Sequence, residues 1–164
     1  MINAQIFVIM VTTNIFGGFK AMALKMRFLY YSKKAKMKDL AENIKKEFDL
    51  AQNYNAIDVI PPAYSCENER LVIIALSGND LDDMVRRFCR ELDKKKAQNV
   101  ALLIDGNEKL AQTALDVLKE TGTNVIENVK MVKFGGLPFI GGKLSDDEKK
   151  DLLDWAHSVV DSIK

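Results

Sequence analysis

The residues most suited to chemistry stand at Ser32-Lys33-Lys34-Ala35-Lys36-Met37, between an apolar run and a helical pattern. A strand, a short turn and a helix N-terminus together form an anion site, because backbone N–H groups and the positive end of the helix dipole converge there. The lysines add point charges that can each meet a phosphate, and Ser32 adds a hydroxyl donor. The chemistry that this segment suggests is phosphate binding.

Hydrophobic periodicity indicates which elements must position the segment. Apolar runs predict strands at 27–32, 71–76 and 100–104, and two further strands are predicted at 56–60 and 125–132. Helical spacing predicts helices at about 38–48, 81–92, 110–118 and 145–163. The last helix opens with Ser145 and Glu148 in capping-box register, and Gly122 is placed to end the third helix. The first helix is expected to begin near Lys38.

Strands that alternate with helices predict an α/β protein with a parallel sheet, because parallel neighbours need crossover connections. The natural strand order is 2-1-3-4-5, in which the ligand crevice lies where the winding reverses, at the carboxyl ends of strands 1 and 3. Three loops meet at that rim, and they supply the candidate ligand-contacting residues. These residues are Ser32, Lys33, Lys34, Ala35, Lys36, Met37, Ser77, Gly78, Asn79, Asp105, Gly106 and Asn107.

The segment Tyr30-Tyr-Ser-Lys-Lys-Ala-Lys-Met-Lys-Asp-Leu-Ala-Glu-Asn-Ile resembles the first strand, loop and helix of the flavodoxin family, which typically reads Tyr-Ser-x-Thr-Gly-Asn-Thr-x-x-x-Ala at this place. The family's Thr, Gly, Asn and Thr fall on Lys34, Ala35, Lys36 and Met37, so all four are replaced. Element order and the helix opening Leu144-Ser-Asp-Asp-Glu extend the resemblance over residues 27–164. It implies a flavodoxin-like three-layer sandwich with a five-stranded parallel sheet of order 2-1-3-4-5, and flavin mononucleotide (FMN) as the family's cofactor.

The replaced loop argues against tight FMN binding. Ala35 and Met37 remove the glycine that lets the backbone approach a phosphate and a hydroxyl that completes the cradle. The loops at 77–83 and 105–108 contain no aromatic residue for the flavin ring, and Tyr64 is the nearby candidate. Trp155 is expected to be a core or surface residue of the last helix. We therefore expect no tightly bound cofactor, FMN if any, and favour solvated surface lysines over phosphate-binding ones at positions 33, 34 and 36.

Other site chemistries are disfavoured. A phosphorelay receiver needs acidic residues where Ser32 and Ser77 stand. His157 has no partner identifiable from the sequence and is expected at the surface. The acidic cluster at 80–83 lies near Asp105, but carboxylates in a helix's first turn ordinarily serve the helix dipole. No metal site and no catalytic residue are predicted.

Composition sets further bounds. The 164 residues suit one domain with a sizeable core, and the net charge of +1 gives no overall field that would attract nucleic acid. Cys66 and Cys89 are too few for a disulfide framework, which favours a reduced, cytoplasmic setting. The apolar run at 6–11 is too short to span a bilayer, so no membrane partner is expected.

Residues 1–25 do not follow the alternating pattern and are read as an N-terminal extension to a flavodoxin-like domain at 26–164. The extension is either a leader outside the native protein, with the natural start at Met22 or Met26, or an extra strand or flexible arm at the sheet edge.

Three hypotheses for function remain open. The first is a flavodoxin-like domain with a degenerate FMN site, which acts as an interaction module or binds another small ligand at the same rim. The second is a divergent FMN-binding electron-transfer protein. The third is a flavin-dependent NAD(P)H:quinone-type reductase. The expected partner is a small molecule or a redox protein, and the sequence leaves the oligomeric state open.

Overall fold

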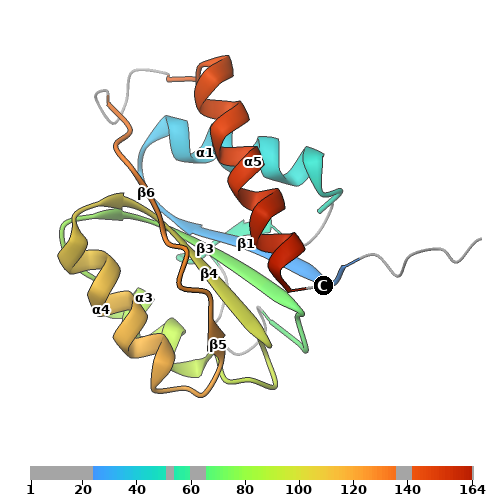
Figure 1. Ribbon diagram of the computed structural model, residues 1–164. Coiled ribbons are helices and arrows are strands. Elements are labelled where there is room, and N and C mark those ends of the chain that lie inside the picture. Colours follow the sequence, from blue (N-terminus) through green and yellow to red (C-terminus); the bar gives the residue numbers. More distant parts are fainter. Residues whose placement is uncertain (1–23, 51–53, 60–65, 136–141, 164) are drawn as a thin grey trace, which may run out of the picture.

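The computed structural model describes residues 24–50, 54–59, 66–135 and 142–163 (Figure 1). Most of the N-terminal extension, the proline pair at 61–62, Tyr64 and the centre of the glycine-rich segment at 135–142 lie outside these residues, and so do the expectations attached to them.

The elements follow in the order β1 (Met26–Tyr31), α1 (Ala35–Glu47), β2 (Tyr54–Ala56), β3 (Leu71–Gly78), α3 (Asp83–Glu91), β4 (Asn99–Gly106), α4 (Glu108–Lys119), β5 (Asn124–Val125), β6 (Lys130–Val132) and α5 (Asp146–Ser162). Among the helices of this part of the chain, none is both long and apolar enough to cross a membrane.

All strand pairs are parallel, and the sheet runs β2-β1-β3-β4-β5. The predicted strand order is thereby confirmed. The single strand predicted at 125–132 is wrong, because the chain turns at Glu127, whose carbonyl accepts the Val129 N–H at 2.8 Å. β5 and β6 result, and both pair with β4: Asn124 lies opposite Asn99 at its start, and Lys130 lies opposite Leu103 near its end.

Helices cover both faces of the sheet, α1 and α5 on one and α3 and α4 on the other (Figure 1). Alternation along β1 shows why its residues are nearly all apolar: Phe28 and Tyr30 pack with α1 and α5, while Leu29 and Tyr31 pack on the α3 and α4 side. A parallel strand buried on both faces has no solvated face that polar residues could occupy.

The start of α1 and the bounds of β2 differ from the sequence-based expectation next to the rim. α1 begins at Ala35 rather than near Lys38, because Met37 continues the buried stripe of Leu40, Ala41 and Ile44. β2 ends at Ala56 instead of extending over 56–60, since the chain turns there and the Val59 N–H bonds to the Ala56 carbonyl at 3.2 Å. The loop between β1 and α1 is therefore only 32–34.

Candidate functional site

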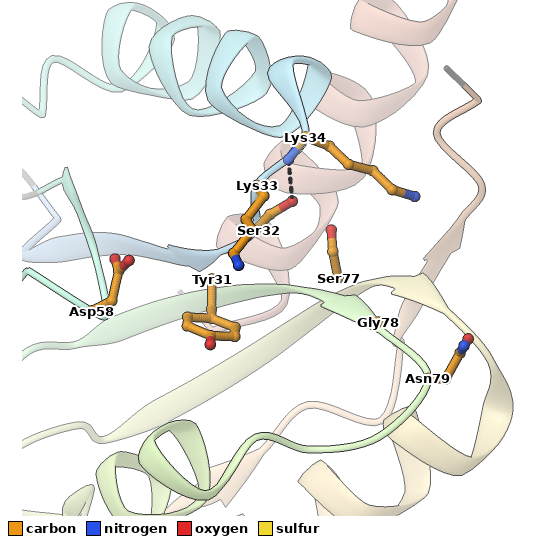
Figure 2. A pocket seen from close by; sticks show the side chains of 8 residues that line it. All are labelled: Tyr31, Ser32, Lys33, Lys34, Asp58, Ser77, Gly78 and Asn79. Carbon is orange, nitrogen blue, oxygen red and sulfur yellow. Dashed lines mark hydrogen bonds between the residues drawn. The ribbon is translucent and has the colours of Figure 1, made fainter. Parts of the chain in front are cut away.

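A cleft of about 460 Å³ lies at the carboxyl edge of the sheet between the ends of β1 and β3 (Figure 2). This is the point at which the winding of the sheet reverses, as the sequence predicted. Its described lining consists of Tyr31, Ser32, Lys33, Lys34, Asp58, Ser77, Gly78 and Asn79. A second hollow of about 570 Å³ lies on the β2 side of β1 and shares Ser32, Lys33 and Asp58 with the cleft. The volume of the cleft is in the range of small-molecule sites.

Lys34 does not project freely into solvent. Its side chain extends across the rim, above the end of β3 (Figure 2). The Nζ atom lies 2.8 Å from Asp105 Oδ2 and donates to the Phe134 carbonyl at 3.2 Å. A lysine at the positive end of a helix is disfavoured by the dipole, and the carboxylate offsets that repulsion.

Asp105 is the centre of this arrangement. Its side chain is 3% exposed, and each oxygen has a partner. Oδ2 accepts from the Ser77 hydroxyl at 2.9 Å as well as from Lys34, and Oδ1 accepts the Phe134 N–H at 3.0 Å. A buried carboxylate is tolerated when it is both paired and hydrogen-bonded. Lys34, Ser77, Asp105 and Phe134, called here the Asp105 network, tie the ends of β1, β3 and β4 to the segment after β6.

Lys36 is also paired, and its side chain is partly buried. Its Nζ atom lies 2.8 Å and 3.0 Å from the two carboxylate oxygens of Glu148, at the start of α5. Its stem passes so close to Gly142 that a Cβ atom there would be 3.1 Å from Lys36 Cγ. The hydrogen bond from Lys36, together with that from the Ser145 N–H, lowers the pKa of Glu148. The predicted capping box of Ser145 and Glu148 is present.

The expectation of solvated surface lysines is therefore wrong for Lys34 and Lys36. A carboxylate on another element neutralises each of them, because the fold brings Asp105 and Glu148 to the start of α1. Lys33 is exposed and lines both hollows, and among the described residues it has no ion pair. The unpaired positive charge of the loop is thus that of Lys33.

The start of α1 differs from the sequence-based picture of a phosphate loop. Lys34 is the N-cap and provides no side-chain hydrogen bond to the first turn, which also contains no acidic residue. Ser32 Oγ instead accepts the Lys34 N–H at 3.1 Å. Met37 is fully buried in the core, so its place among the candidate ligand contacts is wrong. Ala35 lines the second hollow.

An aromatic residue at the cleft was missed by the sequence analysis. Tyr31, the last residue of β1, lines the cleft, and its hydroxyl donates to Asp82 Oδ2 at 3.1 Å. Burial, followed by the carboxylates of Asp82 and Asp58, raises the pKa of this phenol. The sequence of β1 contained a signal for this position. Because neighbouring residues of a strand face opposite sides of the sheet, Tyr30 and Tyr31 cannot both lie on the same side.

The remaining candidate residues divide between the cleft and the scaffold. Asn79 lines the cleft, whereas Asn107 caps α4 by accepting the Leu110 N–H at 2.9 Å. Gly78 and Gly106 lie opposite each other where β3 and β4 end. Asp105, expected at the rim, is a buried pairing group rather than an exposed contact.

Metal and histidine chemistry find no support in the described part of the chain. No group of three or more His, Cys, Asp or Glu side chains there could hold a metal ion. His157 is exposed as expected, and its Nε2 atom lies 2.7 Å from Glu47 Oε1 on the neighbouring helix. The pair links the end of α1 to α5, whereas the cleft lies at the start of α1.

Comparison with known proteins bears on the fold. No protein-family profile matches the sequence, and no curated protein matches it either. Among solved structures, the rubredoxin oxygen:oxidoreductase of the anaerobe Desulfovibrio gigas is similar, with a TM-score of 0.56 and 11% identity over 84% of this chain and 35% of that one. A flavodoxin from the domain Archaea has a TM-score of 0.54 and 10% identity over 84% of this chain and 98% of that one.

The chain thus spans about a third of the length of the oxidoreductase and nearly all of the archaeal flavodoxin. These similarities confirm the predicted flavodoxin-like fold. Identity at this level shows the fold alone, because one fold hosts many activities.

Proposed function

We propose that this protein is a flavodoxin-like domain that binds a small uncharged ligand in the cleft between β1 and β3, and that it does not hold FMN tightly. The pairing of Lys34 with buried Asp105 is the observation that carries the proposal. A lysine at this place would serve a phosphate only if its charge were available to the ligand, and here a carboxylate of the same protein takes it.

The described residues fit FMN poorly. Lys34 and Lys36 are neutralised, and Ala35 and Met37 offer no hydroxyl. The loop from β4 to α4 consists of Asn107 alone, and this side chain is used as a helix cap. No aromatic side chain of the loops after β3 and β4 can therefore enclose a flavin ring.

The cleft does suit an uncharged, partly aromatic ligand. Tyr31 provides an aromatic side chain to the lining, while Asn79 and Asp58 provide exposed hydrogen-bonding groups. Lys33 and Asp58 carry opposite charges, so the unpaired charges of the lining sum to about zero. A heterocycle with several donors and acceptors matches such a lining better than a dianion does.

FMN and riboflavin provide the matched test, because they differ only in the phosphate. We expect no micromolar affinity for FMN, that is, a binding free energy weaker than about −8 kcal/mol. Riboflavin should bind no worse than FMN in a titration followed by flavin fluorescence. Adenosine, uridine and menadione are further uncharged probes, and backbone amide shifts at Ser32 and Asn79 would place a bound probe in the cleft. Tight FMN binding with much weaker riboflavin binding would overturn the proposal.

A divergent FMN-binding electron carrier is the second candidate. The uncapped first turn of α1 favours it, since backbone N–H groups at a helix N-terminus attract a phosphate. An absorption spectrum of the purified protein separates the two candidates, because a bound flavin gives the protein a yellow colour. If the protein is yellow, NAD(P)H oxidation with a quinone then tests the reductase hypothesis.

A further inference from the structure

The charge that the cleft presents to a ligand depends on a residue outside its lining. Lys34 belongs to the cleft wall, and its side chain is 36% exposed, so a ligand in the cleft can contact this side chain. Asp105, which neutralises that ammonium, is 3% exposed and does not belong to the described lining. Solvent and salt screen such a pair weakly, because one partner is buried.

The position of Asp105 is fixed independently of Lys34. The Ser77 hydroxyl holds Oδ2 and the Phe134 N–H holds Oδ1, so the carboxylate cannot turn away from the ammonium. An anion entering the cleft would have to draw Lys34 from a hydrogen-bonded carboxylate and leave that charge buried without its cation. Removal of one partner from a buried pair is strongly unfavourable.

We propose that Asp105 is a specificity-determining residue, which makes the cleft select against phosphate-bearing ligands by holding the Lys34 ammonium. The inference rests on the proposed function only in that it takes the cleft as the place where the ligand binds. An amide at position 105 would keep an acceptor for the Phe134 N–H and turn its NH₂ group toward Lys34. Two donors would then face each other, so the Lys34 ammonium would be released, with its charge uncompensated, toward the cleft.

The test is titration of wild type and Asp105→Asn with inorganic phosphate and with FMN at low ionic strength, by calorimetry and by amide shifts of residues 32–35. The variant should bind phosphate about tenfold more tightly than wild type, or better, which is the size expected of one charge-assisted hydrogen bond. It should also prefer FMN to riboflavin. Added salt should weaken the gain, since the contact is ionic.

Two matched variants show whether Lys34 is responsible. Asp80→Asn changes the net charge of the protein by the same amount. It also frees Lys109 from an exposed ion pair at the same edge of the sheet, and it should leave the affinity for phosphate unchanged. Lys34→Met combined with Asp105→Asn should abolish the gain. The inference is overturned if Asp105→Asn binds phosphate no better than Asp80→Asn does, or if the gain persists without Lys34.

Far-ultraviolet circular dichroism and a melting curve verify that each variant is folded. If Asp105→Asn does not fold, Asp105→Ser removes the same charge with a smaller polar side chain, and the same expectations apply to it. Inorganic phosphate can serve as the probe without knowledge of the natural ligand. A gain of phosphate binding would therefore support the role of Asp105 even if every uncharged probe fails, and failure of those probes would count against the proposed function alone.

Discussion

Gly106 lies so close to Gly78 that a Cβ atom on Gly106 would overlap the Gly78 carbonyl oxygen. The two glycines are partners in the last pair of the β3–β4 ladder, directly after the pair formed by Ser77 and Asp105. The absence of a side chain on Gly106 thus permits the two strand ends to approach closely, next to the place where the Ser77 hydroxyl bonds to the Asp105 carboxylate.

Gly106→Ala should consequently destabilise the protein by about 2 kcal/mol, because backbone atoms must move to admit the methyl group. Gly135→Ala is the control, since a Cβ atom there meets no atom of the described residues within 4 Å, and it should change the free energy of unfolding by less than about 0.5 kcal/mol. Urea denaturation of both variants measures the difference. Equal effects would show that the contact between the glycines does not constrain the rim.

Lys34→Met should destabilise the protein more than Lys36→Met does, although both remove a lysine from the start of α1. Loss of Lys34 leaves the Asp105 carboxylate, which is 3% exposed, without its cation. We expect a loss of about 2 kcal/mol in the free energy of unfolding, which is less than for a fully buried pair because Lys34 is 36% exposed. Loss of Lys36 leaves Glu148, which is 35% exposed, and should cost less than about 1 kcal/mol.

Chemical denaturation gives both free energies. Adding Asp105→Asn to Lys34→Met should restore part of the lost stability, because no unpaired charge then remains buried. If the two single variants are equally stable, the buried position of Asp105 has no energetic consequence.

Glu148 should contribute to acid sensitivity. Its pKa lies below the ordinary value of 4.5 in the folded protein, chiefly because of the hydrogen bond from Lys36. A carboxyl group with a lowered pKa stabilises the fold above its unfolded pKa, and this stabilisation is lost as the pH falls through the folded pKa. The stability difference between wild type and Glu148→Gln should therefore shrink as the pH is lowered below 4.5.

Urea denaturation across the acid range provides the measurement. Lys36→Met should reduce the difference in the same pH window, because the largest cause of the shift is then gone. A stability difference that stays constant with pH would contradict the assignment.

Both cysteines should be unreactive in the folded protein. Cys66 and Cys89 are buried, and burial raises the pKa of the Cys89 thiol to about 12. Since the thiolate is the reactive form, Ellman's reagent should modify neither residue at neutral pH until the protein unfolds. The rate of modification in increasing urea should follow the unfolding curve measured by circular dichroism. Rapid labelling of the native protein would show that one of the thiols is accessible.

Local patterns in the sequence were sufficient for most of the fold. The continuous apolar run at 71–76 identified β3, because a parallel strand that is covered on both faces has no polar face. The stripe that contains Val85 and Phe88 identified α3, because burial of one helix face gives a period of 3.6 residues. The spacing of Ser145 and Glu148 identified the start of α5. Strand order followed from the rules of crossover connections, which allow few arrangements of alternating strands and helices.

The sequence predicted the ends of helices and strands less well where the hydrophobic pattern was weak. Met37 extends the buried stripe of α1 by one turn, yet the lysines around it concealed that continuation. The break between β5 and β6 depends on the Glu127 turn and on the pairing of both short strands with β4. The residue types of a single strand do not show where its partner strand stops pairing with it.

The sequence by itself determined the sheet, its helices and the place of the rim, because these depend on the periodicity of neighbouring residues. Only the tertiary structure decided what the rim can bind. Asp105 of β4 neutralises Lys34, and Lys34 Nζ donates a hydrogen bond to the Phe134 carbonyl, which is 100 residues away along the chain. Such a contact has no periodic signature, since it exists only once packing has brought distant strand ends together. The charge of a site is therefore a property of the folded arrangement, even where the residue types that form it are plain in the sequence.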